Sequence, residues 1–347
     1  MKFFDIKRDV ERMKRLDELP QGLPNKRNAC FLNATLQCLA SVHEGLKDFA
    51  SKSLNEVLTC VNTDHTMSSS MMVHYHQLIE IIATAGLDIK FQHDSHEALL
   101  VLLNSVFKSS NSMDPPFVGK SVSLRRCLNC QRNPAPIPQM FSILTLPFSS
   151  HSLKGCLTDM SRISMVTGVN CDYCSSQAAI SRLRRMNSLS TYLYDMFKSI
   201  HDLHLKSLEC SDHIQPAEIQ KKTTQLIRDK IVSWPDLLIV HFQRSETNGK
   251  STSSISIEEK VSIDDCEYEL CSAIIHFGDA ASTGHFAAIR RWDESVFGLP
   301  VLQRKWIIVS DDKVSRIGSD VFNDDLIKRN VYILVLRKIT AKQFLRE

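Results

Sequence analysis

Two residues far apart in the chain, Cys30 and His285, have the types and settings of a nucleophile and its base. Cys30 stands where a turn-forming stretch ends and an apolar helical pattern begins. A helix N-terminus carries partial positive charge, which favours the thiolate form of a cysteine. His285 follows Gly284 at the start of an apolar run that is typical of a strand. A cysteine, a distant histidine and a polar third residue fit a Cys-His hydrolase, although a cysteine at a helix start is more often structural.

Four other cysteines form two CxxC pairs, Cys127 with Cys130 and Cys171 with Cys174. Each CxxC turn aims two sulfurs at one point, and four thiolates suit tetrahedral Zn²⁺. The alternative is that all four are unpaired thiols in loops. Because cysteine would fill every position and leave none for water, we expect a structural zinc site rather than a catalytic one. The other cysteines are interpreted as core or surface thiols: Cys38, Cys60, Cys156, Cys210, Cys266 and Cys271.

The elements that must position these residues change in character along the chain. Residues 1–20 predict a charged helical lead-in, and Asn28 is a plausible N-cap for the helix that contains Cys30. A second helix is predicted over residues 92–107, with leucines along one face. Short apolar runs typical of strands follow at residues 141–147, 237–242, 285–290, 306–310 and 331–337. Helices first and mostly antiparallel strands later predict an α+β architecture.

Composition excludes several classes of protein. The chain has 347 residues, 43% of them hydrophobic and 23% charged, with a formal net charge of +3. No basic block or basic-aromatic stripe points to nucleic acid. No apolar run approaches the roughly 18–20 residues that cross a bilayer, and the N-terminus lacks a secretory signal. We therefore expect a cytosolic chain whose eleven cysteines stay reduced.

Five segments together resemble the ubiquitin-specific proteases. Residues 22–33, GLPNKRNACFLN, are similar to the family's cysteine box, Gly-Leu-x-Asn-x-Gly-Asn-Thr-Cys-Tyr-x-Asn. Residues 92–97, QHDSHE, are similar to its Gln-Gln-Asp-Ala-His-Glu segment. The other matches are a strand at 234–244, a histidine box at 276–278 and 284–286, and a closing strand at 332–334. The matching segments occur in the family's order and span almost the whole chain.

This resemblance implies a papain-like cysteine protease with a thumb, zinc-bearing fingers and a palm. After the lead-in 1–20, the catalytic domain would cover 21–340, with the thumb at about 21–114 and the fingers and palm at about 115–340. The paired CxxC units fall where the family has its zinc-bearing fingers. Asn25 matches the family's oxyanion donor. Asp94 and Glu97 match positions that hold the basic tail of ubiquitin, although an N-terminal cap and a solvated acid are the simpler interpretation of this pair.

The sequence departs from the family pattern at several positions. Arg27 replaces a glycine that allows a tight turn, Ala29 replaces a threonine, and His93 replaces a glutamine. At the family's third catalytic position, usually Asp or Asn, this chain has Ser310, followed by Asp311. One branch of the family, found at the mitochondrial outer membrane, is similar in using a serine there. That branch has an N-terminal membrane helix and we expect none from this sequence, so the resemblance only weakly implies a mitochondrial location.

The resemblance therefore predicts an active deubiquitinase in which Cys30 attacks, His285 transfers the proton and Ser310 orients His285. The expected partners are ubiquitin and ubiquitinated proteins, and the expected cofactor is structural zinc. Two alternatives stay open. Arg27 and Ser310 are compatible with a catalytically inactive ubiquitin-binding module, and the same chemistry would serve a thiol hydrolase for another ubiquitin-like modifier.

Overall fold

A computed structural model describes residues 19–25, 27–63, 68–106, 114–185, 220–246, 249–280, 283–292 and 305–339. All but the last two residues of the predicted lead-in 1–20, and Cys210, lie outside these residues. The chain divides into two compact units. Unit one contains residues 1–119, 141–159 and 234–347, and unit two contains 120–140 and 160–233.

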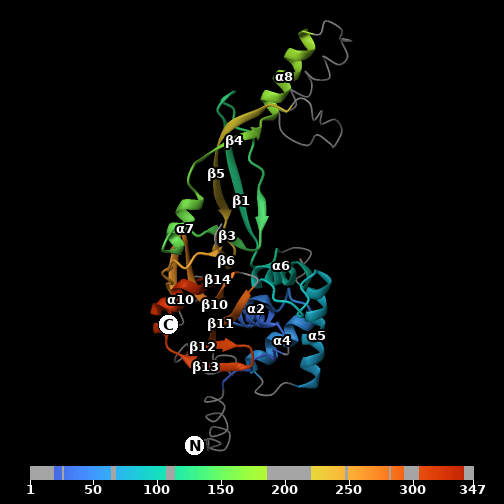
Figure 1. Cartoon of the computed structure of the whole chain (residues 1–347), viewed down its shortest axis with the longest axis vertical. Helices are drawn as coiled ribbons and strands as arrows, with labels where there is room; N and C mark the ends of the chain where they lie inside the picture. The colour runs from blue at the N-terminus through green and yellow to red at the C-terminus, as the bar shows by residue number, and fades with distance from the viewer. Residues whose placement is uncertain are drawn as a thin grey trace, which may run out of the picture. The chain divides into compact units, whose positions relative to one another are not determined.

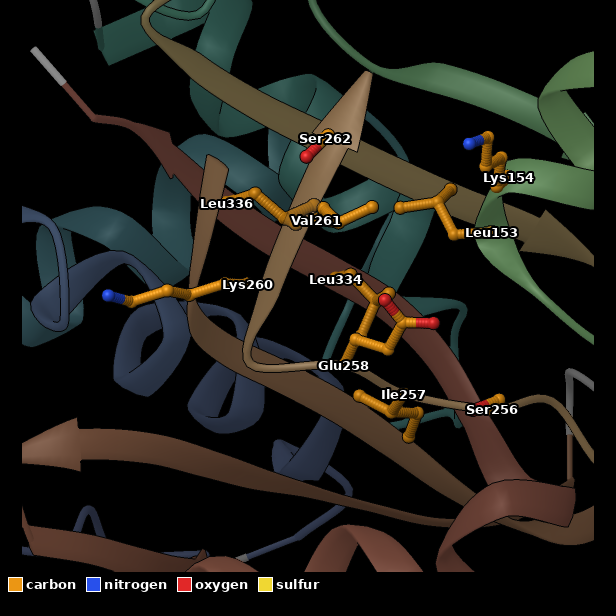
Figure 2. A pocket seen from close by; sticks show the side chains of 10 residues that line it. All are labelled: Leu153, Lys154, Ser256, Ile257, Glu258, Lys260, Val261, Ser262, Leu334 and Leu336. Atoms are coloured by element: carbon orange, nitrogen blue, oxygen red, sulfur yellow. The ribbon is translucent and has the colours of Figure 1, made fainter. Parts of the chain in front are cut away.

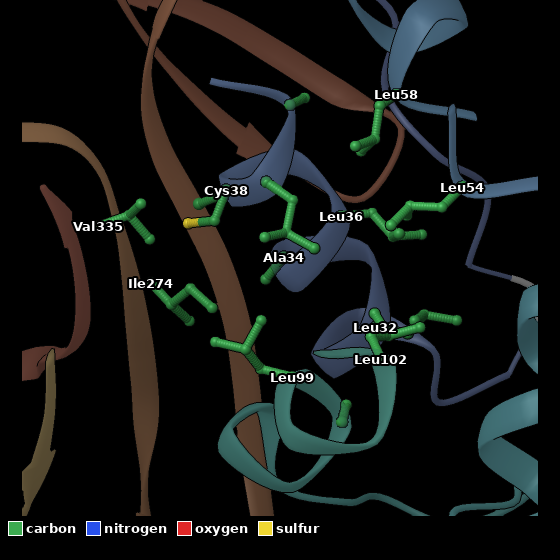
Figure 3. Packing of buried hydrophobic residues seen from close by; sticks show 14 of the residues in the cluster. Leu32, Ala34, Leu36, Cys38, Leu54, Leu58, Leu99, Leu102, Ile274 and Val335 are labelled. Atoms are coloured by element: carbon green, nitrogen blue, oxygen red, sulfur yellow. The ribbon is translucent and has the colours of Figure 1, made fainter. Parts of the chain in front are cut away.

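The first part of unit one is helical. Its helices are α2 (Cys30–Ala40), α3 (His43–Leu46), α4 (Lys52–Thr63), α5 (Ser69–Thr84) and α6 (Ser95–Val106). All eleven residues of α2 are buried, including the polar residues Asn33 and Gln37. Figure 3 shows why: Leu36 faces leucines of α4, Leu32 faces Leu102 of α6, and Cys38 lies on the side of the strands. Each buried leucine contributes about 1.5–3 kcal/mol relative to an exposed one, so α2 is held rigidly.

The later part of unit one is an eight-stranded sheet with the order β13-β12-β11-β10-β14-β6-β3, and β9 pairs with β10. Its strands are β3 (Leu144–Pro147), β6 (Leu237–Gln243), β9 (Lys260–Ile263), β10 (Cys266–Ala280), β11 (Thr283–Trp292), β12 (Lys305–Ser310), β13 (Lys313–Ile317) and β14 (Val331–Lys338). All pairs are antiparallel except β3 with β6. In Figure 1 the helices gather on one side of these strands, and α2 packs directly on β11.

Short elements complete unit one: α7 (Leu153–Met160), β7 (Ser245–Glu246), β8 (Gly249–Lys250), η3 (Ser319–Asn323) and α10 (Asp325–Asn330). The mixed α and β class predicted from the sequence is confirmed. The predicted helix 92–107 begins later, at Ser95, and the predicted strand 141–147 is regular only from Leu144.

Unit two is a four-stranded sheet with a helix. The strand order is β2-β1-β5-β4, with β1 (Gly119–Cys127), β2 (Gln139–Phe141), β4 (Ser164–Asn170) and β5 (Lys222–Ser233). Strand β5 pairs antiparallel with both β1 and β4. The helix α8 (Asp172–Arg185) begins inside the second CxxC pair. Among the described helices of either unit, none combines the length and apolar character needed to cross a membrane.

Candidate active site

Cys30 is the first residue of α2, as the sequence predicted, but its helix is capped differently. The N-cap is Ala29, whose side chain makes no capping hydrogen bond. The predicted cap, Asn28, instead donates its side-chain amide to the carbonyl of Lys90, 2.9 Å away. Asn25 partly replaces a side-chain cap, because its Oδ1 accepts the backbone N–H of Ala29 at 3.0 Å. The prediction of an Asn28 cap is therefore wrong, because this side chain bonds to a distant loop.

The Cys30 thiol is buried at the start of α2. Its residue is 4% exposed, and burial raises the pKa of the thiol above its ordinary value. A backbone hydrogen bond from Phe286 lowers this pKa, and the nearby carboxylate of Asp311 raises it again. Burial, the largest influence on this pKa, therefore opposes the thiolate form that a helix N-terminus favours. The bond with Phe286 also places Cys30 beside the residue that follows His285.

His285 lies near the start of β11, opposite Phe277 of β10. Its imidazole Nε2 is 2.8 Å from the hydroxyl oxygen of Ser310, the last residue of β12. Gly284 has φ +132°, and a Cβ there would lie 2.3 Å from the carbonyl oxygen of Phe277. Glycine is therefore required before His285, both for the backbone conformation and for the close approach of β10.

Gln92 fixes the same turn from the helical side. Its Oε1 accepts the N–H of Gly284 and its Nε2 donates to the carbonyl of Gly284, both at 3.2 Å. This two-point contact holds the backbone just before His285. The sequence comparison matched Gln92 to a family segment but gave it no role, and only the fold brings it to the histidine strand.

Asp311 does not follow the alternation of a regular strand. β12 ends at Ser310, and Asp311 has φ +55° in a left-handed turn. Its carboxylate consequently stays on the side of His285, with 4.0 Å between Oδ2 and Nε2. The same carboxylate accepts hydrogen bonds from the side-chain amides of Asn25 at 2.9 Å and Asn33 at 2.8 Å. Strand alternation would have sent Ser310 and Asp311 to opposite faces; the turn brings both towards His285.

The backbone around this turn is closely packed. A Cβ on Gly22 would lie 2.6 Å from the carbonyl oxygen of Asp311, and Leu23 donates its N–H to that oxygen at 2.8 Å. Asn33 is 1% exposed, and its Oδ1 accepts the hydroxyl of Tyr75 at 2.6 Å. Asn33 is a site residue that sequence reasoning missed. Its signal was a polar residue at a buried position of an otherwise apolar helix.

An open cavity of about 470 Å³ borders the histidine side of the site, and Cys30 is not among its lining residues. Its lining includes Asn25, His285, Ser310 and Asp311. The amide nitrogen of Asn25 carries two hydrogens, and Asp311 accepts one of them. The second hydrogen is left to donate to a negatively charged oxygen in the cavity. The cavity therefore combines a proton acceptor with a positioned donor for an oxyanion.

Asp94 and Glu97 have different settings. Asp94 accepts the N–H of His96 at 2.7 Å, which makes it an N-terminal cap of α6, and accepts the hydroxyl of Tyr332 at 2.5 Å. Burial and the negative charge of Asp94 raise the pKa of Tyr332. Glu97 is exposed in the first turn of α6. The cap interpretation of Asp94 is thus correct, and Glu97 is the carboxylate of the pair that faces solvent.

The two CxxC pairs converge in unit two, as the sequence predicted. The four sulfurs of Cys127, Cys130, Cys171 and Cys174 all lie within 4.8 Å of one another. Cys127 and Cys174 are 3.8 Å apart, and so are Cys130 and Cys171. A tetrahedral Zn²⁺ with Zn–S bonds of about 2.3 Å requires sulfurs about 3.8 Å apart. The four cysteines therefore fit a structural metal site.

Comparisons with known proteins agree with this geometry. The ubiquitin carboxyl-terminal hydrolase family matches residues 21–336. A "Ubiquitin carboxyl-terminal hydrolase 26" from Oryza sativa subsp. japonica is 23% identical over 327 residues, covering 88% of this chain and 27% of that protein. A "Ubiquitin carboxyl-terminal hydrolase 17-like protein E" from Mus musculus is 24% identical over 352 residues, covering 91% of this chain and 56% of that protein. This chain thus spans between about a quarter and about half of these relatives.

Solved structures show the same fold. The "SAGA Ubp8/Sgf11/Sus1/Sgf73 DUB module bound to ubiquitin aldehyde" superposes with a TM-score of 0.60 at 16% identity, covering 98% of this chain and 77% of that one. The module "bound to monoubiquitin" gives a TM-score of 0.61 at 15% identity. The fold is thus the one seen in these deubiquitinase structures. The chain belongs to the ubiquitin carboxyl-terminal hydrolase family. The mitochondrial location suggested by the resemblance is not borne out.

Proposed function

We propose that this chain is a deubiquitinating thiol protease that cleaves the bond after the C-terminal glycine of ubiquitin. The observation that carries the proposal is the contact of 2.8 Å between His285 Nε2 and Ser310 Oγ in the cavity that Asn25 also lines. This contact holds the imidazole in one orientation, and the hydrogen bond from the backbone of Phe286 places Cys30 beside the residue that follows His285. Family membership supplies the class of substrate.

In the first step Cys30 attacks the glycine carbonyl while His285 accepts the thiol proton. The raised pKa of Cys30 favours proton transfer during attack over a preformed thiolate. Negative charge develops on the carbonyl oxygen, and the free amide hydrogen of Asn25 stabilises it. His285 then gives the proton to the leaving lysine amine, and a thioester remains on Cys30. Water, activated by His285, hydrolyses the thioester and releases ubiquitin with a free carboxylate.

Ser310 acts as the third member of the triad in this proposal. Its hydroxyl accepts a hydrogen bond from the imidazole and fixes the tautomer, but it carries no charge to stabilise the imidazolium. Asp311, 4.0 Å from the imidazole, supplies that negative charge while it holds Asn25. Ser310 also supports assigning this chain to the branch of the family that has a serine in its catalytic triad. The cytosolic location expected from the sequence stays a prediction.

Substrate recognition and zinc complete the proposal. Glu97, exposed on α6, would bind the basic tail of ubiquitin, and Asp94 would shape the same segment through its cap and its bond to Tyr332. The four cysteines of unit two would hold Zn²⁺, which stabilises that unit and takes no part in the chemistry. The proposed domain is residues 21–340, with the lead-in before it.

The test is labelling by a ubiquitin probe with a thiol-reactive C-terminal group. We expect one probe per chain, loss of labelling in Cys30→Ala, and unchanged labelling in Cys266→Ala, a half-buried cysteine of β10 outside the site. Cys30→Ala should still bind ubiquitin. Binding without any labelling of the wild-type protein would identify an inactive ubiquitin-binding module. Labelling only by probes built on another modifier would assign a different substrate.

A further inference from the structure

An exposed aromatic residue stands beside the candidate active site. Phe91 lies in the loop between α5 and α6, and the residue is 67% exposed. Among the residues that the structure describes, it is the only exposed large apolar residue that is aromatic. A single exposed apolar residue is common on protein surfaces, so its meaning depends on its setting.

The loop that carries Phe91 is fixed to the segment before Cys30. Asn28 donates its backbone N–H to the carbonyl of Ile89 at 3.1 Å, and its side-chain amide to the carbonyl of Lys90 at 2.9 Å. Both acceptors directly precede Phe91 in the chain. The loop therefore holds Phe91 next to the turn that leads into α2.

The other side of Phe91 is fixed to the strand of the histidine. Gln92, the next residue, accepts one hydrogen bond from the backbone of Gly284 and donates one to it, both at 3.2 Å. Gly284 directly precedes His285. Phe91 thus stands between two anchors, one on each segment that carries a reacting group. The fold leaves its ring in water, so a bound substrate is what would bury it.

Two cations lie on the same loop and turn. The side chains of Arg27 and Lys90 are both exposed. Asp88 pairs with Lys90, with 3.2 Å between Oδ2 and Nζ. The pKa of Asp88 is lowered first by the backbone N–H of Lys90, and then by the charges of Lys90 and Arg27, so Arg27 acts on the same carboxylate. Two cations against one carboxylate leave one positive charge among these three side chains, 2 − 1 = +1.

This charge opposes the tail of ubiquitin as the occupant. The tail is basic, and in the proposed function it binds to Glu97, which is exposed on α6. Arg27 and Lys90 would repel it, since like charges at an interface suppress binding. The other part of the substrate that must come close to Cys30 is the protein whose lysine amine is the leaving group.

We propose that Arg27, Lys90 and Phe91 form an acceptor surface, which docks the protein that carries ubiquitin. The inference rests on the proposed function and narrows its substrate class. The surface fits a modified lysine whose neighbours in the chain include a carboxylate for the cations and an aliphatic side chain for the ring. Fully burying a phenylalanine side chain changes a binding constant roughly ten- to a hundredfold, so burying part of this one changes it about tenfold.

A pocket elsewhere in unit one cannot serve this purpose. It has a volume of about 200 Å³, and Figure 2 shows Leu334 and Leu336 of β14 in its apolar floor, with Lys154 at the edge. Ile333 and Val335 pack in the core cluster that includes α2. Strand alternation therefore places Leu334 and Leu336 on the face of the sheet away from α2. Lys154 is thus an exposed lysine remote from the reacting groups, and it supplies a control.

The test compares two conjugates in which ubiquitin is joined through an isopeptide bond to the lysine of a short peptide. Glutamate and leucine flank the lysine in the first peptide, and arginine and serine flank it in the second. Each kcat/KM is divided by that for ubiquitin–aminocoumarin, which has no acceptor protein. We expect the full chain to prefer the acidic, aliphatic conjugate about tenfold by this ratio.

Two variants and two matched controls locate the surface. Phe91→Ala should lower the ratio for the first conjugate about tenfold. Leu326→Ala, at a residue of α10 that is 57% exposed, should leave the ratio unchanged. Arg27→Glu should shift the preference towards the basic conjugate, since it reverses one charge. Lys154→Glu, which changes charge on the far face of the sheet, should leave the preference unchanged.

The outcomes separate this inference from the proposed function. Cleavage of aminocoumarin and both conjugates without a preference, or a ratio that Phe91→Ala does not change, would overturn the acceptor surface. Equal losses on aminocoumarin and conjugate in Phe91→Ala would assign the ring to ubiquitin itself and would also overturn it. If no substrate is cleaved, the proposed function fails instead. The affinities of Cys30→Ala for the two conjugates then decide, and the acceptor surface requires tighter binding of the acidic one.

Discussion

Replacing Ser310 by alanine tests the most unusual feature of the candidate active site. The hydroxyl of Ser310 lies 2.8 Å from Nε2 of His285. Among the residues that the structure describes, no other side chain is hydrogen-bonded to this imidazole. In the proposed reaction the imidazole becomes cationic. A hydrogen bond to a charged group contributes about 1.5–3 kcal/mol, so its loss should lower kcat roughly ten- to a hundredfold. Ser310→Asp should retain activity, because a carboxylate is the commoner partner at this position in the family it resembles.

The assay is kcat/KM of both variants on one fluorogenic ubiquitin substrate, with ubiquitin affinity and melting temperature measured as controls for folding. The reasoning would be refuted if Ser310→Ala were as fast as wild type. If Asp311→Ala were inactive at the same time, with folding and ubiquitin binding retained, the triad would be Cys30, His285 and Asp311.

A double-mutant cycle separates the two roles that Asp311 has in the structure. Its carboxylate holds Asn25 at 2.9 Å and also lies 4.0 Å from the imidazole of His285. We expect Asn25→Ala alone to lower kcat by about 10²–10³. If Asp311 acts only through Asn25, the double variant Asn25→Ala with Asp311→Ala should be no slower than Asn25→Ala. A further loss in the double variant would show direct action on His285.

Three further predictions use other assays. Elemental analysis should find about one zinc per chain. The variant Cys174→Ser should lose the metal and melt at a lower temperature. If that variant kept its zinc, Cys174 would be excluded as a ligand. Asp311→Asn removes a negative charge that raises the pKa of Cys30, so alkylation of Cys30 should begin at lower pH, whereas Asp312→Asn on the exposed neighbour should not shift it. Burial lowers the pKa of His241 to about 3, below its unfolded value near 6.5. The unfolded state therefore binds the proton first, and the free energy of unfolding should fall as pH drops from about 6.5 towards 3, by up to about 1.4 kcal/mol per pH unit. His241→Phe should flatten this slope in denaturant titrations, and an unchanged slope would mean that other groups cause it.

The sequence predicted the features that depend on short segments. The start of a helix at Cys30 follows from turn residues before it and regularly spaced apolar residues after it. The strand with His285 follows from a short apolar run after a glycine. The convergence of the CxxC pairs follows from the geometry of each turn, because a knuckle that binds metal must aim both sulfurs together.

Features that depend on contacts between distant segments were not predictable in this way. Asp311 bonds to Asn25 and Asn33, which are 286 and 278 positions away in the chain. Gln92 reaches the backbone of Gly284 across 192 positions. Nothing in the local pattern indicates that β12 ends at Ser310 or that Asp311 takes a left-handed conformation. The fold imposes that conformation, since the backbone at Gly22 packs against the turn.

The structure also bears on whether the departures from the family pattern disable the site. Arg27 stands where the family pattern has a glycine. Its side chain is exposed, and its positive charge helps to lower the pKa of Asp88, after the larger effect of the backbone hydrogen bond from Lys90. The side chain of this arginine thus reaches solvent instead of filling the site. Both departures stay reasons to test for an inactive module, and the sharper test falls on Ser310, whose uncharged hydroxyl lies 2.8 Å from the imidazole.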